Sequence, residues 1–268
     1  MWKQQHTLYH TPYRIGGNSK IYLLKNNKSL ICKKSSSNRV LRDIGGLYLS
    51  QQYYKDVSPI LKEVYYDSTK NEYYYFMERY TDDLLDVIIN KYTRLTFNDC
   101  LTISYKLTDK LNKIHSSYIA HRDLKPENIF LNETKNNTYD FNSLRIGDFD
   151  SCCNSQYPDI LTSYGTEKYD PPEKKNNLIY NYIAGDIYSL GLIKCILLTN
   201  GTFDVYFFRK PIKSSLLYHI IMNEDDRYEN YKVIKEYCKL INKMLNHDPL
   251  KRPSLQYMLQ FYNRIKNI

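Results

Sequence analysis

The pattern of short runs rich in apolar and aromatic residues, separated by polar turns, predicts that the first third of the chain is rich in β-strands. Residues 13–24 and 30–33 flank the polar turn KNNK, as the two strands of a hairpin would. A second pair of such runs, residues 59–66 and 72–77, flanks the polar segment DSTKN. We therefore expect four strands in this region, joined by short polar turns.

Beyond residue 80 the apolar positions follow the period of an α-helix. Within residues 97–117, leucine or isoleucine recurs mostly every three or four positions, which places these side chains on one face of a helix. Shorter helices are expected at residues 38–53 and 84–90. The longest apolar run, residues 187–198, is interrupted by Lys194 and is too short to span a bilayer.

Length and charge narrow the class of protein. The 268 residues suffice for one large domain or for two small lobes with separate cores. The 38 basic and 29 acidic residues give a net charge of +9, yet the basic residues form no dense block. A lysine-rich surface accounts for this charge better than attraction to acidic partners does. Nucleic-acid binding and membrane insertion are therefore not indicated.

The cysteines point to a reducing compartment. The six cysteines form no C-x-x-C pair, and Cys152 and Cys153 are adjacent, which suits neither a disulfide nor a zinc site. We expect six reduced thiols, as in a cytoplasmic or nuclear protein. The N-terminal residues MWKQQ contain no apolar core of a signal peptide.

Three polar side chains in the middle of the chain could act together. Asp123 and Asn128 lie in the segment HRDLKPEN, which apolar residues precede and follow, and Asp148 stands directly behind a further apolar segment. Carboxylate and amide oxygens are ligands for hard divalent ions, and a carboxylate can accept the proton of an attacking hydroxyl. The three residues could therefore hold a metal ion against a polyphosphate.

The segment HRDLKPEN resembles the catalytic loop of eukaryotic-type protein kinases. The resemblance implies that Asp123 accepts the proton of the substrate hydroxyl and that Lys125 neutralises charge on the transferred phosphoryl group. It also implies that Asn128 and Asp148 bind the metal ion. Lysine at position 125 is typical of the Ser/Thr branch of the family.

The segment DFD at residues 148–150 is similar to the Asp-Phe-Gly metal motif of that family, with Asp150 in the place of glycine. Glycine gives this segment backbone freedom, whereas Asp150 adds a carboxylate near the metal ligands. Because Asp148 is retained, we interpret the difference as altered regulation and not as lost chemistry.

The segment GGNSKIY, which begins at Gly16, is similar to the glycine-rich loop of kinases. Two glycines near a turn are, by themselves, usually no more than a turn. In the family pattern Arg14 takes the place of the first glycine, which affects close packing against the phosphates. The resemblance implies nucleotide contacts at Ile15, Gly16, Gly17, Asn18, Ser19 and Ile21.

The segment LICK at residues 30–33 resembles the strand that carries the ATP-binding lysine. Lys33 would contact the α- and β-phosphates, and Ile31 would lie against adenine. Asp43 has the spacing of the helix glutamate that pairs with this lysine, although an exposed helix aspartate is an alternative. Aspartate is one methylene shorter, and the following two glycines each cost the helix about 1 kcal/mol relative to alanine.

The resemblance places the remaining nucleotide contacts at the gatekeeper, the hinge and the floor under adenine, which are Met77, Glu78, Tyr80 and Phe130. Two further aspartates, Asp82 and Asp83, either reach a ribose hydroxyl or cap the helix at residues 84–90.

Residues 151–173 resemble a kinase activation segment. Thr166 would bond Asp123 and Lys125, another feature of the Ser/Thr branch. Thr162 is a candidate phosphosite that Arg122 could pair with once phosphorylated, and an unmodified loop threonine is an equal alternative. Architectural bonds are also implied: Asp186 to the catalytic-loop backbone, and Arg252 to Glu173.

The resemblance implies an α+β, two-lobed protein kinase fold within a single domain, residues 1–268. A β-rich lobe would reach residue 78, a hinge would span residues 78–81, and a helical lobe would span residues 82–268. The expected activity is transfer of the ATP γ-phosphoryl group to protein Ser/Thr hydroxyls with Mg²⁺, or with Mn²⁺ as the alternative ion. A pseudokinase that scaffolds partners is the alternative. Expected partners are a protein substrate and an upstream activating kinase, and the oligomeric state is left open.

Overall fold

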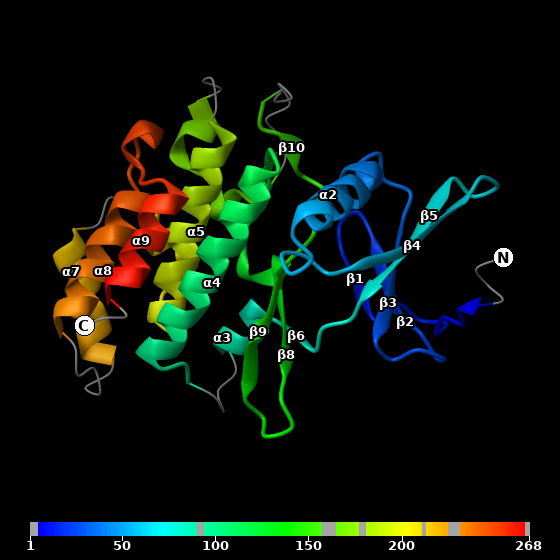
Figure 1. The fold of residues 1–268 in the computed structure, drawn as a ribbon, viewed down its shortest axis with the longest axis horizontal. Helices are drawn as coiled ribbons and strands as arrows, with labels where there is room; N and C mark the ends of the chain where they lie inside the picture. The colour runs from blue at the N-terminus through cyan, green and yellow to red at the C-terminus, as the bar shows by residue number, and fades with distance from the viewer. Residues whose placement is uncertain are drawn as a thin grey trace.

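The computed structural model describes residues 5–89, 94–156, 165–176, 181–210, 213–224 and 231–265. An antiparallel sheet with helix α2 beside it forms one part of the molecule, and a group of helices forms the other (Figure 1). This arrangement confirms the expected two-lobed α+β architecture.

The sheet of the first lobe has the strand order β1-β2-β3-β5-β4. Its elements are β1 (Arg14–Ile15), β2 (Lys20–Leu23), β3 (Leu30–Ser35), β4 (Leu61–Asp67) and β5 (Glu72–Glu78), and α2 spans Val40–Tyr53. The expectation of one continuous strand over residues 13–24 is wrong. The Gly16 N–H donates to the Ser19 carbonyl at 2.9 Å, and this turn separates β1 from β2.

The pleat of β3 directs its lysines to opposite faces. Lys33 pairs with Ile21 of β2 and Tyr75 of β5 across the sheet, and its side chain faces α2. Lys34 lies on the other face, where it forms an ion pair with Glu72 at 2.9 Å.

The second lobe is mainly helical. Its helices are α3 (Leu84–Ile89), α4 (Phe97–Ser116), α5 (Tyr182–Leu198), α6 (Val205–Phe208), α7 (Ser214–Glu224), α8 (Tyr231–Met244) and α9 (Leu255–Ile265). A capping box between Thr96 and Asp99 starts α4. Helix α5 is buried on almost every side, so its continuous apolar run belongs to the core. Among the described helices, none has the length and apolarity needed to cross a bilayer.

Short strands and 3₁₀ turns complete the second lobe, and the loops between them carry the candidate chemistry. The strands are β6 (Asp82–Asp83), β7 (Ile119–Ala120), β8 (Ile129–Glu133), β9 (Tyr139–Ile146) and β10 (Cys153–Asn154), with 3₁₀ turns at Pro126–Asn128, Glu167–Tyr169, Pro172–Asn176 and Pro249–Lys251. Strand β8 lies between β6 and β9, and β7 pairs with β10. The β7–β8 and β9–β10 loops therefore lie beside each other, because Ala120 pairs with Cys153 at one end and Ile129 pairs with Ile146 at the other. All six cysteines are free and buried.

Candidate active site

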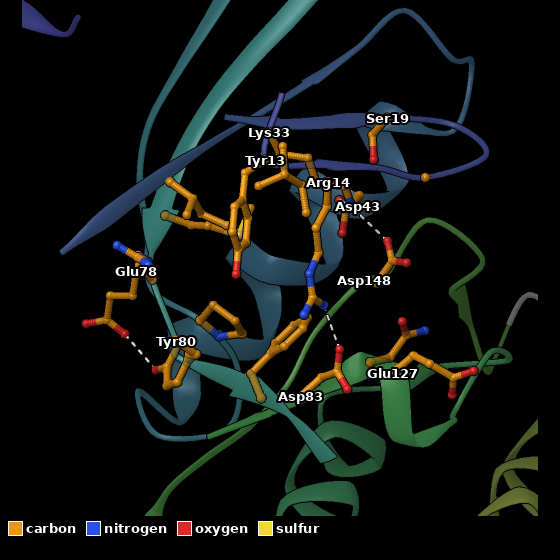
Figure 2. A pocket seen from close by; sticks show the side chains of 18 of the residues that line it. Tyr13, Arg14, Ser19, Lys33, Asp43, Glu78, Tyr80, Asp83, Glu127 and Asp148 are labelled. Carbon is orange, nitrogen blue, oxygen red and sulfur yellow. Dashed lines mark hydrogen bonds and ion pairs between the residues drawn. The ribbon is translucent and has the colours of Figure 1, made fainter. Parts of the chain in front are cut away.

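A pocket of about 430 Å³ opens between the two lobes. Figure 2 shows side chains that line it from the sheet above and from the β6–β8 region below. The predicted nucleotide contacts that line it are Ile15, Gly16, Gly17, Ser19, Ile21, Ile31, Lys33, Met77, Glu78, Tyr80 and Phe130. Asn18 does not line this pocket and lies beside Asp150 instead.

Lys33 joins the two lobes at the back of the pocket. Its Nζ lies 2.7 Å from Asp43 Oδ2 and 2.7 Å from Asp148 Oδ1. Burial works to lower the pKa of Lys33, but the two carboxylates outweigh burial and raise this pKa well above its ordinary value. Burial works to raise the pKa of Asp148, yet Lys33 keeps it below 3.8. Both groups are therefore charged at neutral pH.

The carboxylate of Asp43 has three donors and is 1% exposed. Besides Lys33, the Tyr75 hydroxyl donates to Oδ2 at 2.6 Å, and the Phe149 N–H donates to Oδ1 at 2.8 Å. The alternative of an exposed helix aspartate is therefore wrong. Asp43 ties α2 to the sheet and to the segment that carries Asp148.

The catalytic-loop backbone is held by Asp186 from the start of α5. Its carboxylate accepts the N–H groups of His121 at 2.7 Å and Arg122 at 2.8 Å, and it lies 2.9 Å from His115 Nε2. Arg122 has a φ of +68°, which is unfavourable for a bulky residue. The hydrogen bonds that the His121 and Arg122 N–H groups donate to Asp186 stabilise this turn just before Asp123. The sequence predicted this contact between Asp186 and the catalytic-loop backbone.

Asp123 and Lys125 project from the same loop. Lys125 Nζ lies 2.9 Å from Asp123 Oδ2 and donates to Thr166 Oγ1 at 2.7 Å. Thr166 was expected to bond both residues, but within the described residues it reaches Asp123 through Lys125. Asp123 is 8% exposed, and its Oδ1 accepts no hydrogen bond from the described part of the chain. One oxygen of this carboxylate is thus enclosed by the protein without a hydrogen-bond donor from the described residues.

The site offers oxygen donors for a metal ion. Carboxylate oxygens of Asp123, Asp148 and Asp150 lie within 4.8 Å of one another. Asn128 Nδ2 donates to the Asp123 carbonyl at 2.8 Å, which directs the amide oxygen of Asn128 away from that carbonyl. Carboxylate and amide oxygens suit hard divalent cations such as Mg²⁺ and Mn²⁺. The residues present therefore fit such an ion.

The hinge side of the pocket is aromatic. The rings of Tyr80 and Phe130 stack with centroids 6.3 Å apart. A Cβ at Gly147 would lie 2.7 Å from Phe130 Cε2. Only glycine at position 147 therefore leaves room for the Phe130 ring in its observed position. The Glu78 carboxylate accepts the Tyr80 hydroxyl at 3.0 Å and points away from the pocket (Figure 2).

Arg14 is a pocket residue that the sequence reasoning treated only as a missing glycine. Its side chain crosses the mouth of the pocket from β1 (Figure 2) and reaches Asp83 at 2.6 Å and Asp86 at 2.8 Å. Asp83 also accepts the Asp86 N–H at 3.0 Å, so the expected helix-capping role is present. Tyr13 and Pro59 also line the pocket and were missed, because no motif marks them.

The activation segment is described only in part. Thr162, the candidate phosphosite, lies outside the described residues. Further along, Arg252 forms two bonds to Glu173, at 2.6 and 2.7 Å, as the sequence predicted. Both side chains are buried, so each charge has the partner that burial requires.

Comparison with known proteins gives a consistent result. The sequence pattern of the protein kinase domain matches residues 16–262. A protein of Acanthamoeba polyphaga mimivirus named as a serine/threonine-protein kinase, R436, is 32% identical over 63% of this chain and 57% of its own length. The Aurora kinase of Yarrowia lipolytica is 29% identical over 70% of this chain and 47% of its own length. A calcium and calcium/calmodulin-dependent serine/threonine-protein kinase of Lilium longiflorum is 31% identical over 66% of this chain and 33% of its own length. The chain thus spans little more than half the length of the first of these relatives and less of the others.

Proposed function

This chain belongs to the protein kinase family, and on that premise we propose that it is an active serine/threonine kinase. It would transfer the γ-phosphoryl group of ATP to hydroxyl groups of protein substrates. The observation that carries the proposal is Lys33, which is paired at once with Asp43 and Asp148. This double pair brings α2, β3 and the metal motif into one arrangement, as phosphoryl transfer by positioning requires.

Asp123 is proposed to orient the substrate hydroxyl and to accept its proton. Its Oδ2 faces Lys125 and Asn128, whereas Oδ1 has no donor among the described residues. The hydrogen-bonding capacity of Oδ1 is thus unused, and a substrate hydroxyl that reaches it would meet a carboxylate held in place by Lys125 and Asn128. Lys125 would balance the charge on the transferred group, and its bond to Thr166 supports assignment to the Ser/Thr branch.

The pocket is proposed to bind ATP with the adenine near Met77 and Phe130 and with the phosphates near Lys33. Main-chain groups of residues 78–80 would bond the adenine edge, and the turn at Gly16 would cover the phosphates. Asn128 and Asp148 are the proposed holders of the metal ion. When bound, Mg²⁺ supplies positive charge that neutralises the polyphosphate.

The extent of the domain, its cellular location and its partners are also part of the proposal. The kinase domain would extend over residues 1–268, with the lobes meeting at a hinge over residues 78–81. Six free, buried thiols support a cytoplasmic or nuclear location. Protein substrates and an upstream kinase that acts on Thr162 are the proposed partners.

A pseudokinase scaffold is the second candidate. It is favoured by Arg14, which crosses the pocket mouth where the family has glycine, and by Asp150 in the metal motif. The first candidate is preferred because Lys33, Asp123, Asn128 and Asp148 are all present, and metal and base groups are harder to replace than glycines.

The test offers the purified protein Mg-ATP and three otherwise identical basic peptides whose acceptor is Ser, Thr or Tyr. We expect phosphate on the Ser and Thr peptides and none on the Tyr peptide. Equal transfer to the Tyr peptide would contradict the specificity. No transfer to any peptide, together with no change in thermal stability on adding Mg-ATP, would support the scaffold.

A further inference from the structure

Among the residues that the structure describes, Asp150 forms no ion pair, although it lies among other carboxylates. Asn18 Nδ2 donates to its Oδ2 at 2.8 Å, and the Ser151 hydroxyl donates to its Oδ1 at 2.8 Å. Both donors are neutral. Within the described ranges no lysine, arginine or histidine forms an ion pair with Asp150. Among the described residues, its negative charge therefore has no ion-pair partner in direct contact, although Lys33 and Arg39 line the same small pocket.

The surrounding charges make this imbalance larger. Oxygens of Asp123, Asp148 and Asp150 lie within 4.8 Å of one another. Within the described ranges, the ammonium groups that pair with this cluster are Lys125, which pairs with Asp123, and Lys33, which Asp148 shares with Asp43. Four carboxylates thus face two lysines. Like charges at this spacing repel each other unless a cation lies between them.

A second observation points to a ligand at the same place. Asp123 is nine-tenths buried, and its Oδ1 accepts no hydrogen bond from the described residues. A buried carboxylate oxygen without a donor is costly, and a bound cation removes that cost. In the protein without substrate, this oxygen therefore lacks a donor among the described residues, whereas Asp150 has two neutral donors and no ion pair there.

The backbone conformation at position 150 neither requires glycine nor excludes aspartate. Among the described residues, Asp148 has a φ of +64°, whereas Asp150 is not one of those with positive φ. Position 150 therefore does not require the conformational freedom of glycine, and a side chain is accommodated without strain.

On the basis of the proposed function, we propose that Asp150 is an additional metal-binding carboxylate. With Asp148 and Asp123 it would let this protein hold one divalent cation before any nucleotide binds. Asn18, which lies in the turn between β1 and β2, bonds the same carboxylate. It is a positioning residue, and through it metal binding would also steady the glycine-rich turn.

The test measures Mn²⁺ binding to the nucleotide-free protein by electron paramagnetic resonance. We expect one Mn²⁺ site that weakens at least about tenfold in both Asp150→Gly and Asp150→Asn. The matched control is Asp109→Asn, which removes a surface carboxylate paired with Lys113 and should change nothing. Asp148→Asn should abolish the site. Circular dichroism of every variant checks that each is folded.

Hydrogen exchange gives a second readout. Mn²⁺ should slow amide exchange at residues 16–19 in the wild type and should not do so in Asp150→Asn or Asn18→Ala. The inference is overturned if the wild type binds no Mn²⁺ without nucleotide, or if Asp150→Asn binds it as tightly as the wild type does. Phosphoryl transfer by the same wild-type sample is scored separately. Transfer that persists while Asp150 proves irrelevant would reject this inference and leave the proposed function intact.

Discussion

Gly46 of α2 lies so close to Phe149 that a Cβ added at position 46 would be 2.5 Å from the Phe149 Cβ. Helix α2 can approach the Phe149 segment this closely only because residue 46 has no side chain. The close approach explains how Asp43, one methylene shorter than the glutamate of the family pattern, still reaches Lys33 at 2.7 Å. Two departures from the family pattern, a shorter acid and a helix glycine, therefore compensate for each other.

Gly46→Ala should push α2 away from Phe149 and weaken the bond between Asp43 and Lys33. We expect a net loss of about 1–2 kcal/mol in the free energy of unfolding, since overpacking outweighs the gain in helix propensity. Phosphoryl transfer should fall with it. Chemical denaturation and initial rates measure the two effects.

Gly45→Ala is the matched control for this prediction, because nothing lies within 4 Å of a Cβ at that position. It should stabilise the protein by up to about 1 kcal/mol without loss of activity. The double variant Asp43→Glu with Gly46→Ala should recover activity relative to Gly46→Ala, since the longer acid suits a more distant helix. Equal stability of the two alanine variants would refute the compensation.

Arg14→Gly should tighten ATP binding about fivefold. Arg14 forms ion pairs with Asp83 and Asp86 at the pocket mouth. A nucleotide that reaches this side of the pocket must displace the Arg14 side chain. The Arg14–Asp86 pair is exposed on both sides, and such pairs contribute up to about 1 kcal/mol, which corresponds to a factor of about five in the dissociation constant. Isothermal titration with ATP and Mg²⁺ measures the change.

Arg79→Ala serves as the control for Arg14, because it removes a cation that also lines the pocket and leaves the Arg14 ion pairs in place. It should not tighten binding. Weaker binding by Arg14→Gly would instead make Arg14 a contact of the nucleotide.

Lys194→Met should stabilise the protein at neutral pH by at least about 1 kcal/mol. Lys194 is fully buried in α5, where its Nζ bonds the hydroxyls of Thr108 at 2.9 Å and Tyr262 at 2.7 Å. Burial depresses the pKa of Lys194 well below its ordinary value of 10.5. A hydrophobic side chain of similar length avoids this cost.

The sign of the pH dependence follows from that depressed pKa. Below pH 10.5 the unfolded chain binds a proton at Lys194 that the folded chain does not bind until its own lower pKa is reached. Wild-type stability should therefore rise relative to Lys194→Met as the pH increases toward 10.5. Thermal unfolding of both proteins across this range measures the difference. A constant difference would mean that Lys194 stays charged in the folded protein.

The catalytic loop could be recognised from the sequence because its residues are contiguous. Asp123, Lys125 and Asn128 fall within six positions, and the order of strands and helices around them follows from apolar periodicity. The fold class was predictable because the motif and the order of strands and helices can both be read from local sequence. The roles of the individual residues remain predictions, which the phosphoryl-transfer assays and the variants test.

The compensating contacts could not be predicted, because each joins distant parts of the chain. Asp43 and Phe149 are 106 positions apart, and Arg14 and Asp83 are 69 apart. Sequence reasoning could therefore count Arg14 only as a departure from a pattern. It could propose Asp43 as the partner of Lys33, but it could not decide against an exposed helix aspartate. Whether a short acid reaches its lysine depends on the distance between α2 and the Phe149 segment, and no local propensity encodes that distance.

The central claim is that this protein transfers phosphate with Asp123 as the group that accepts the substrate proton. The most direct measurement is the initial rate of ³²P transfer from γ-labelled Mg-ATP to a basic Ser peptide, for the wild type beside Asp123→Asn. We expect transfer by the wild type and a rate at least about a hundredfold lower for Asp123→Asn, with ATP binding retained in both. Equal rates would contradict the role of Asp123. Absence of transfer in both, without binding of Mg-ATP to either, would contradict the kinase activity itself.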